Sequence, residues 1–583
     1  MARGTEATTD LGVLARPRIE RRAGPLGLFP ALTLCLLLGP LAAGLLGTLL
    51  PALGYLPVLG GHSPSLEPWR ALLATPGVGE GVRLSLTVGL ASTALSLGLV
   101  ALFCAAWHGT RWFRWLSRLL SPLLAVPHVT VAFGLAFLLT PSGWLLRLVA
   151  PLTGFEHPPD WLIVHDSWGL SLVFGLVLKE APFLFLITLA ALNQSNATAL
   201  RQLAASLGYG PTVGWLKAVF PQIYPQLRLP VFAVLAYSCA SVEMALVLGP
   251  TTPPPLAVQL LRWFNAPDLS LRFMASAGAI LQLTVVVLAM LIWCALERLV
   301  RDLGRRWIRR GGRGRGDRWL RWISLVALAS CFALTFAGLL AMGLWSVAGL
   351  WRYPDIFPAT FSLRQWLRHA DDILLPLWHT LSVGLAAAAL ALLLVLGCLE
   401  HEARVGRRPT VRALWLLYLP LLVPQIAFLF GAQVLLVGVD LDGSWIALLW
   451  AHLLFVLPYV FLSLADPYRA FDERYARSAR CLGASANGVF WRVRLPMLLR
   501  PVLVALAVGF AVSVAQYLPT LFAGAGRYAT LTTEAVALSA GSNRRIMGVY
   551  AMLQMSLPFA AFALAQGLPA LLFRQRRGLQ VGR

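Results

Sequence analysis

The chain has 583 residues, of which 58% are hydrophobic and only 13% are charged, and its mean hydropathy is +0.73. Soluble domains are usually about half apolar and about a quarter charged. The composition therefore excludes an ordinary cytosolic enzyme, a disordered scaffold and a small secreted disulfide protein. It predicts a polytopic membrane protein embedded in a lipid bilayer.

The net charge of +23 does not indicate a nucleic-acid partner, because the arginines gather at the ends of apolar runs and do not alternate with stacking aromatic residues. Ten arginines and two acidic residues lie between Arg298 and Arg321, whereas segment 352–379 has three of each. Such asymmetry is typical of cytoplasmic against external loops. The seven cysteines are scattered, and no His, Asp and Glu cluster has a ligand spacing, so we expect no metal site.

A helix needs about 20 apolar residues to cross the hydrocarbon core. After a polar segment, 1–25, the apolar runs predict about twelve transmembrane helices in an all-α fold. They are 26–53, 84–107, 119–140, 168–193, 226–249, 275–297, 322–350, 380–399, 413–438, 445–465, 502–524 and 547–572. The even number places both termini, including the tail 574–583, on one side, and the arginine-rich loops make that side cytoplasmic.

An Arg- and Gly-rich stretch, 298–321, separates a first six-helix half, 26–297, from a second, 322–573, and we interpret it as a cytoplasmic linker. The two halves contain related motifs. Val126-Pro127 matches Val423-Pro424 at an offset of 297, and Pro182 matches Pro458 at an offset of 276. The chain is therefore predicted to be two homologous halves in tandem.

The most specific repeat lies in the loop between the fourth and fifth spans of each half. The segment Gln202-Leu-Ala-Ala-Ser-Leu-Gly208 is followed thirteen residues after its glycine by Pro221. In the second half, Arg477-Ser-Ala-Arg-Cys-Leu-Gly483 is followed at the same distance by Pro496. These residues predict a short cytoplasmic helix that ends at the glycine, a second short helix, and a proline near the start of the next span.

This pattern resembles the EAA loop of permeases in binding-protein-dependent ABC importers. In that family the loop forms a coupling helix that fits into a groove of the ATPase subunit. The fusion of two permease units resembles the ferric iron, thiamine and polyamine branch. Three further segments resemble its YnjC-like group: Pro127-His128, Pro141–Trp144 and Gly249–Ala257.

The resemblance implies two six-helix halves of the type I importer fold in a bacterial cytoplasmic (inner) membrane. It also implies two partners, which are two copies of an ABC ATPase and an extracytoplasmic solute-binding protein. The residues expected to form the two coupling loops are Gln202, Ala204, Gly208, Pro221, Arg477, Ala479, Gly483 and Pro496. The acidic residue that names the loop is replaced by Gln202 and Arg477, so docking is carried over only to the glycines and prolines.

Catalytic motifs are missing from the sequence. There is no Gly-x-x-x-x-Gly-Lys-[Ser/Thr] phosphate-binding loop, no His-Glu-x-x-His and no Gly-x-Ser-x-Gly. We therefore expect no enzyme activity and no cofactor in this chain. ATP and Mg²⁺ are expected on the separate ATPase.

Ionisable and amide side chains within the apolar runs mark candidate positions on a translocation path. They are Lys179, Glu243, His128, Gln425 and Gln516. Glu243, placed opposite Lys179, would either contact a cationic solute or form a structural ion pair. The histidine and the glutamines would otherwise serve helix packing.

The sequence leaves two questions open. A secondary active transporter with six-plus-six repeats is the alternative to the importer, although the repeated loop is not a feature that such a transporter requires. The solute also stays open, with thiamine-like, ferric and polyamine cargoes all compatible with the resemblance.

Overall fold

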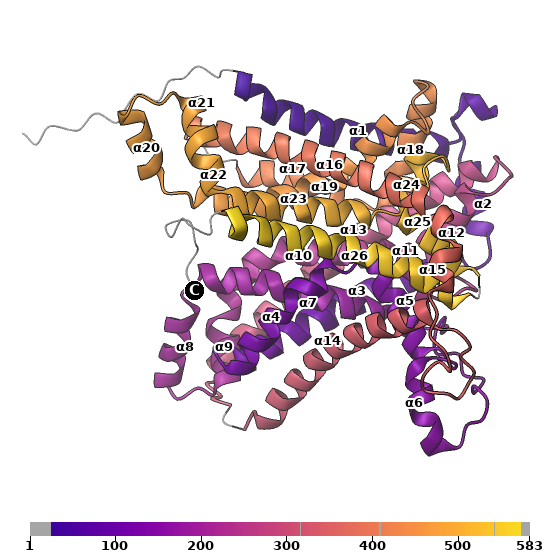
Figure 1. Ribbon diagram of the computed structural model, residues 1–583, viewed down its shortest axis with the longest axis horizontal. Coiled ribbons are helices and arrows are strands. Elements are labelled where there is room, and N and C mark those ends of the chain that lie inside the picture. The colour runs from indigo at the N-terminus through magenta and orange to yellow at the C-terminus, as the bar shows by residue number, and fades with distance from the viewer. Residues whose placement is uncertain (1–24, 315, 407–409, 542, 573–583) are drawn as a thin grey trace, which may run out of the picture.

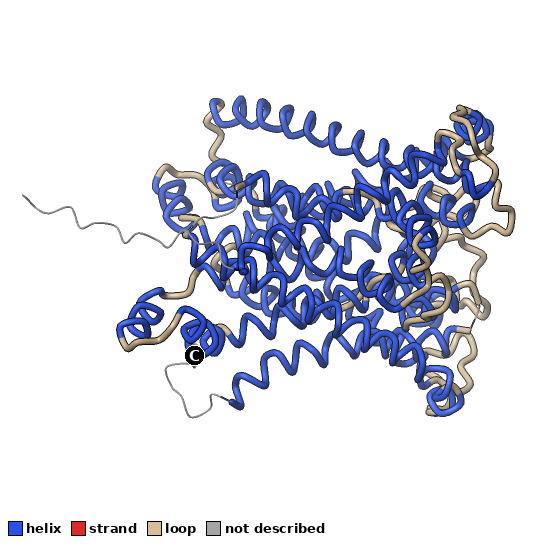
Figure 2. The backbone as a smooth tube through the Cα atoms, turned by 90° about the horizontal axis from the view of Figure 1, so that it is seen from above, coloured by secondary structure: helices blue, strands red, loops and turns tan. Residues whose placement is uncertain are grey.

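The computed structural model describes residues 25–572 except 315, 407–409 and 542. In this part of the chain all named elements are helices, and most of them run along the longest axis of the molecule (Figure 1). The connecting loops gather at its two ends (Figure 2). The terminal segments predicted to be cytoplasmic fall almost entirely outside the described residues.

Each half is a series of helices, whose bounds are as follows. The first half contains α1 (Leu28–Ala52), α2 (Glu67–Ala74), α3 (Val78–Trp107), α4 (Arg111–Ala125), α5 (His128–Leu139), α6 (Trp144–Thr153), α7 (Leu170–Gln194), α8 (Ala197–Ser206), α9 (Pro211–Ala218), α10 (Phe220–Ala240), α11 (Glu243–Leu248), α12 (Leu256–Phe264) and α13 (Leu271–Arg309). The second contains α14 (Arg318–Val347), α15 (Arg364–Arg368), α16 (Ala370–Val405), α17 (Val411–Leu422), α18 (Gln425–Gly438), α19 (Trp445–Arg469), α20 (Glu473–Cys481), α21 (Ala486–Val489), α22 (Leu495–Met497), α23 (Leu499–Val514), α24 (Leu518–Gly524), α25 (Leu531–Ser539) and α26 (Arg544–Leu572).

Among the described residues, nine helices are long and apolar enough to cross a membrane, and two bent pairs raise the number to at most eleven. The predicted count of twelve is therefore not confirmed. The span without a match is 226–249, which falls on α10 and α11. The first turns of α10 contain two prolines and two glutamines before Arg228, so this helix begins as a polar one.

The linker between the halves is shorter than its composition predicted. Helix α13 continues to Arg309, and α14 begins at Arg318. Most of the segment 298–321 is thus helical, because arginine, leucine and tryptophan are compatible with a helix that has left the apolar layer. Only residues 310–317 connect the two helices.

The helices recur at the same offsets as the sequence motifs. Helices α7 and α19 begin 275 residues apart (445 − 170) and end 275 residues apart (469 − 194). The same offset relates both ends of α12 and α25, while α5 and α18 begin 297 residues apart (425 − 128). These are the offsets at which the motifs recur, so each half uses the same plan.

The third and fifth spans of each half are broken within the molecule. The third spans break at Pro127 and Pro424, where α17 and α18 meet at 93°. The fifth spans break between α10 and α11 and between α23 and α24. Proline removes a backbone donor, and broken backbone at membrane depth is tolerated where it lines protein or a water-filled cavity.

The two halves interlock through their first spans. Helix α1 packs against α18 of the second half, and α14 packs against α5 of the first. Glycines meet at both crossings: a methyl group built on Gly47 would lie 2.6 Å from the carbonyl oxygen of Gly431, and one on Gly134 would lie 3.0 Å from the carbonyl carbon of Gly338. The Thr48 hydroxyl also accepts the Gly431 N–H at 3.1 Å.

This packing predicts that Gly431→Ala destabilises the protein. The added methyl group would overlap the backbone of α1, and overpacking of this kind costs about 1–3 kcal/mol. The midpoint of thermal unfolding in detergent should fall by several degrees. Gly438→Ala, at the end of the same helix with no atom near the added methyl, is the control and should leave the midpoint unchanged. Equal midpoints for both variants would contradict the close crossing.

Candidate functional site

The repeated loop of the first half contains a helix that ends at a left-handed glycine. Helix α8 is followed by Gly208, whose φ is +80°. The N–H of Tyr209 donates to the carbonyl of Ala204 at 3.1 Å, and the N–H of Gly208 donates to that of Ala205 at 2.9 Å. This pair of hydrogen bonds is a Schellman motif, which satisfies the last carbonyls of the helix and favours glycine at its left-handed position.

The loop of the second half has the same closure. Helix α20 is followed by Gly483, whose φ is +87°. The N–H of Ala484 donates to the carbonyl of Ala479 at 3.0 Å, and the N–H of Gly483 donates to that of Arg480 at 2.9 Å. Each of these residues lies 275 positions after its counterpart, so the two loops present the same local shape.

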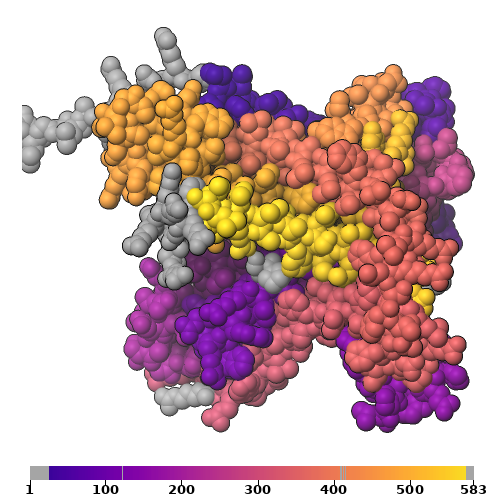
Figure 3. All heavy atoms as spheres, in the orientation of Figure 1, coloured from indigo at the N-terminus to yellow at the C-terminus, as the bar shows by residue number. Residues whose placement is uncertain are grey.

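Both helices lie at one end of the molecule, where they form two separate projections (Figures 1 and 3). The residue before each glycine is an exposed leucine: Leu207 is 56% exposed and Leu482 is 87% exposed. Gln202 and Arg477 are exposed on the same helices. An apolar side chain beside a glycine turn, repeated at both projections, is suited to contact with another protein.

Beyond the glycines the loops differ. In the first half α9 leads directly into α10, with Pro221 as the second residue of that helix. In the second half α21 is followed by a π-helical turn, Phe490–Arg494, and Pro496 lies in the short helix α22. The segment ending with α22 meets α23 at 75°. The two prolines are therefore equivalent in the sequence, but the chain enters the fifth span through different short helices in the two halves.

The first loop is held by the connection between the halves. The N–H of Gly210 donates to the carbonyl of Arg313 at 2.8 Å, and the Lys217 ammonium donates to the carbonyl of Gly312 at 2.9 Å. The N–H of Thr212 donates to the Asp317 carboxylate at 3.2 Å. The linker thus binds the loop that precedes it.

The second loop is held by a buried ionic network. The Arg494 guanidinium, 4% exposed, binds Glu400 at 2.7 Å and Glu473 at 2.6 Å. Glu400 also accepts the hydroxyl of Tyr468 and binds Arg404 at 2.7 Å. This network joins the start of α20 to the ends of α16 and α19. Sequence reasoning missed this network, because its members are 4 to 94 residues apart and Glu400 directly follows an apolar run.

The first half has apolar residues at the corresponding positions. Arg494 corresponds to Val219 (494 − 275), and Glu400 corresponds to Ala105 (400 − 295). Val219 is 0% exposed and Ala105 is 3% exposed. The two halves therefore connect loops with the same glycine closure to their transmembrane helices by different interactions.

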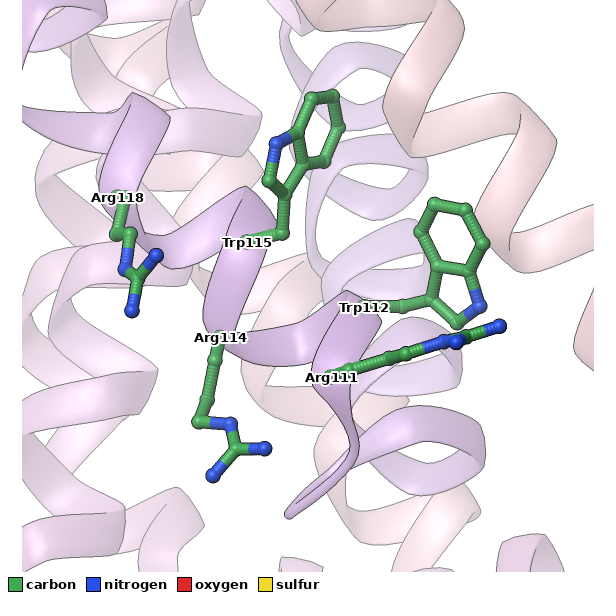
Figure 4. Close-up of a pocket in the computed structure, with 5 residues that line it drawn as sticks. All are labelled: Arg111, Trp112, Arg114, Trp115 and Arg118. Atoms are coloured by element: carbon green, nitrogen blue, oxygen red, sulfur yellow. The ribbon is translucent and has the colours of Figure 1, made fainter.

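A basic surface lies beside the first loop. Arg111, Arg114 and Arg118 of α4 line an open depression of about 600 Å³ together with two tryptophans (Figure 4). None of the three arginines forms an ion pair within the described part of the chain. The neighbouring His108 is half-buried near Arg201, and partial burial and that guanidinium together lower the pKa of His108 to about 4.

The candidate residues of the translocation path lie at the helix breaks. His128 and Gln425 are the first residues of α5 and α18, Glu243 is the first residue of α11, and Gln516 lies between α23 and α24. Glu243, His128 and Gln425 are half-buried, whereas Gln516 is buried. Of the helices that begin at these breaks, α5 packs against α14 and α26 of the second half, and α18 packs against α1 and α13 of the first.

The expected pairing of Lys179 with Glu243 is wrong. The Lys179 ammonium donates to the carbonyls of Val126 at 2.6 Å and Leu124 at 3.3 Å, where the end of α4 favours a cation. The Glu243 carboxylate accepts the hydroxyl of Tyr237 at 2.8 Å. Sequence spacing could not reveal that the break at Pro127 supplies free carbonyls to the lysine.

Glu180, next to Lys179, has a different partner. Its carboxylate lies 3.2 Å from Nε2 of His128, and the His128 ring lies 4.6 Å from the ring of Tyr237. Glu180, His128, Tyr237 and Glu243 thus form a continuous chain of contacts across four helices. By contrast, His452 is fixed by two hydroxyls, those of Ser513 at 2.7 Å and Thr520 at 3.0 Å, so it serves packing.

Comparison with known proteins identifies the family. The chain is 34% identical over 520 residues to the inner membrane ABC transporter permease protein YnjC of Escherichia coli, a match that covers 88% of this chain and 93% of the relative. The chain belongs to the ABC transporter permease family. It is a multi-pass membrane protein with two tandem permease halves.

Two more distant relatives match only part of this chain. The molybdenum transport permease ModB of Mycobacterium tuberculosis is 34% identical over 167 residues, which are 26% of this chain and 63% of ModB. The spermidine/putrescine transport permease PotC of Escherichia coli is 26% identical over 169 residues, which are 28% of this chain and 62% of PotC. No family model matches the chain.

The buried network predicts that removal of Glu400 lowers the stability of the protein and that a second substitution restores it. Glu400→Ala leaves the Arg494 charge buried beside a single, half-exposed partner, and breaking such a pair costs about 3–5 kcal/mol. Thermal unfolding of the purified protein should therefore shift to lower temperature. The double variant Glu400→Ala with Arg494→Val installs the residue types of the first half and should recover most of the loss. A double variant no more stable than the single one would contradict this account of the network.

Proposed function

We propose that this chain is the transmembrane subunit of an ABC importer in a bacterial inner membrane. It forms the solute path, binds two copies of a separate ATPase subunit through its two loops, and receives solute from a binding protein on the opposite face. The observation that carries the proposal is the pair of equivalent helices, α8 and α20, each closed by a left-handed glycine and exposed at the same end. One such loop for each ATPase subunit accounts for their number.

The proposed mechanism is alternating access driven by the partner. ATP and Mg²⁺ bind to the ATPase, and closure of the ATPase dimer moves the two loops toward each other. The loops continue into α10 and α23, so their displacement changes the packing between the halves. A ligand shifts such an equilibrium only through unequal contacts with the two states, and the loops would make those contacts.

The distribution of arginines supports a cytoplasmic position for the loops and for both termini. The start of α4, the end of α13 and the start of α14 are rich in arginine and adjoin the first loop. Helix α1 starts and helix α26 ends at this same end of the molecule (Figure 1). The external loops 54–83, 141–167 and 352–379 then face the solute-binding protein.

The path is proposed to run between the halves past Lys179, Glu243, His128, Gln425 and Gln516. Thiamine-like, ferric and polyamine solutes are the cargo classes that we consider. The partial similarity to a spermidine/putrescine permease supports an amine, although the similarity to a molybdenum permease shows that related chains serve other cargoes. A secondary transporter is disfavoured, because ion-driven transport requires no pair of exposed docking loops.

The proposal predicts that Gly483→Arg abolishes capture of one ATPase subunit. An L-residue at φ +87° is strained, and the added side chain would occupy the docking surface. The wild-type chain and the variant would be co-purified with candidate ATPase subunits of the same organism, and the ATPase content of each complex would be measured by mass photometry. Two ATPase copies should remain with the wild type and at most one with the variant. The corresponding Gly208→Arg variant should behave in the same way.

Gly526→Arg is the matched control. Gly526 has a φ of +75° and open space around it, as Gly483 has, but it lies between α24 and α25 at the other end of the molecule. This variant should retain both ATPase copies. Loss of ATPase from the control as well, or full retention in Gly483→Arg, would overturn the docking role of the loops.

A further inference from the structure

The outer face of α4 carries arginines at helical spacing. Arg111, Arg114 and Arg118 lie three and seven residues apart, and all three are exposed. Phe113 and Leu116, between them in the sequence, are buried. Residues three, four or seven positions apart share one face of a helix. Helix α4 therefore has an apolar side packed on the protein and an arginine side turned away from it.

Two tryptophans complete the depression that these arginines line. The ring centres of Trp112 and Trp115 lie 6.4 Å apart, and the Arg111 guanidinium lies 5.6 Å from the centre of the Trp112 ring. The side chains of Arg114 and Arg118 extend from α4 to one side (Figure 4). Trp115 is 51% exposed. The depression thus offers guanidinium groups together with an uncovered aromatic surface.

The same residue pattern recurs at the start of α14. Residues 111–115 are Arg-Trp-Phe-Arg-Trp, and residues 318–322 are Arg-Trp-Leu-Arg-Trp. Trp107 joins the two segments, because its ring lies 5.4 Å from that of Trp322 and its Nε1 donates to the carbonyl of Arg321 at 2.9 Å. Helix α4 also packs against α14. We name residues 111–118 and 318–322 the Arg-Trp surface, to which both halves of the chain contribute.

The start of α14 indicates the depth of the Arg-Trp surface in the bilayer. This helix is long and apolar enough to cross a membrane. The exposed face of its first turns consists of Trp319, Trp322, Ile323 and Val326. Tryptophan is enriched at the boundary between headgroups and hydrocarbon, and aliphatic side chains face the hydrocarbon. The arginines that precede this apolar face therefore lie at the level of the lipid phosphates.

The positive charge of the Arg-Trp surface is not neutralised by the described residues. None of its five arginines forms an ion pair with any of them. The acid nearest in sequence, Asp317, instead accepts the N–H of Thr212 at 3.2 Å. Like charges gathered at one surface repel one another, and an anion bound between them offsets this repulsion.

We propose that the Arg-Trp surface binds the phosphate headgroup of an anionic phospholipid, with the arginines of α4 on the phosphate and the tryptophans beside the start of the acyl chains. A planar guanidinium binds phosphate through two parallel hydrogen bonds. An acidic protein surface would also satisfy the charge, but it would not account for exposed tryptophans that continue into the aliphatic face of α14. The inference does not rest on the proposed transport function, because it concerns the membrane and not the solute.

A lipid bound here would stabilise the contact between the two halves. Helix α4 belongs to the first half and α14 to the second, so a headgroup that contacts both adds an interaction between them. Arg201 of α8 reaches the turn before α4, where its guanidinium lies 3.5 Å from Nδ1 of His108. The lipid would therefore stabilise the folded chain next to the first loop.

The test measures thermal unfolding of the full chain in a neutral detergent with added phosphatidylglycerol, or with phosphatidylcholine of the same acyl chains. A molecule that binds the folded state raises the midpoint of unfolding with its concentration. Phosphatidylglycerol should raise the midpoint of the wild type more than phosphatidylcholine does. The triple variant Arg111→Gln, Arg114→Gln, Arg118→Gln should need at least about tenfold more phosphatidylglycerol for the same rise, since each arginine near an anionic lipid surface contributes a factor of about five.

Matched controls separate this surface from a general attraction of lipid to a basic protein. The triple variant Arg298→Gln, Arg301→Gln, Arg309→Gln removes the same charge from exposed positions of α13 outside the Arg-Trp surface, so it should respond as the wild type does. Sodium phosphate, which supplies the anion without acyl chains, should not reproduce the rise. Trp115→Ala changes an exposed side chain and should weaken the response, which tests the surface if the α4 triple variant does not fold.

Three results would overturn the proposal: a wild type that responds equally to the two lipids, an equal loss of response in the α4 and α13 variants, or a rise with sodium phosphate as large as with phosphatidylglycerol. If the α4 variant does not fold, an unchanged response of Trp115→Ala would do the same. The α4 variant should also capture two ATPase subunits as the wild type does. Loss of ATPase with an unchanged lipid response would assign the surface to a protein contact instead.

Discussion

The close crossing of glycines between the halves is the contact on which the rest of the structure depends. At Gly47 with Gly431, and at Gly134 with Gly338, two backbones approach so closely that no side chain fits between them. Lipid offers no hydrophobic drive for helix association, so such contacts supply the packing energy. They attach the first span of each half to the third span of the other. Each half is thereby completed by its partner, and the broken third spans are fixed in the interior.

The two functional regions depend on these contacts between the halves. The breaks at Pro127 and Pro424 free backbone carbonyls and place His128 and Gln425 at the start of α5 and α18. The repeated loops lie at one end of the molecule, between α7 and α10 and between α19 and α23. The loops share a glycine-closed shape, yet the first is held by the linker and the second by the Arg494 network. The two loops therefore have the same glycine closure but are attached to the rest of the protein by different interactions. An ATPase pair would act on two loops that are held by different contacts.

The sequence predicted what is local and what is repeated. The apolar runs located the helices, and the glycines and prolines marked the loop geometry, because a left-handed turn and a missing N–H constrain the backbone wherever they occur. It did not predict contacts between distant residues. Lys179 was expected beside Glu243. It instead binds backbone carbonyls that have no helical partner because α4 ends there. Glu180 pairs with a histidine 52 residues away. The breaks also reduced the count of continuous spans.

The central claim is that movement of solute is driven by ATP hydrolysis in a partner that docks on both loops. The most direct measurement is uptake into proteoliposomes that contain the chain with its ATPase, with the solute-binding protein on the other side. The account predicts accumulation that requires ATP on the ATPase side and persists when ionophores collapse the proton and sodium gradients. Accumulation without ATP, driven by an ion gradient and abolished by ionophores, would contradict it.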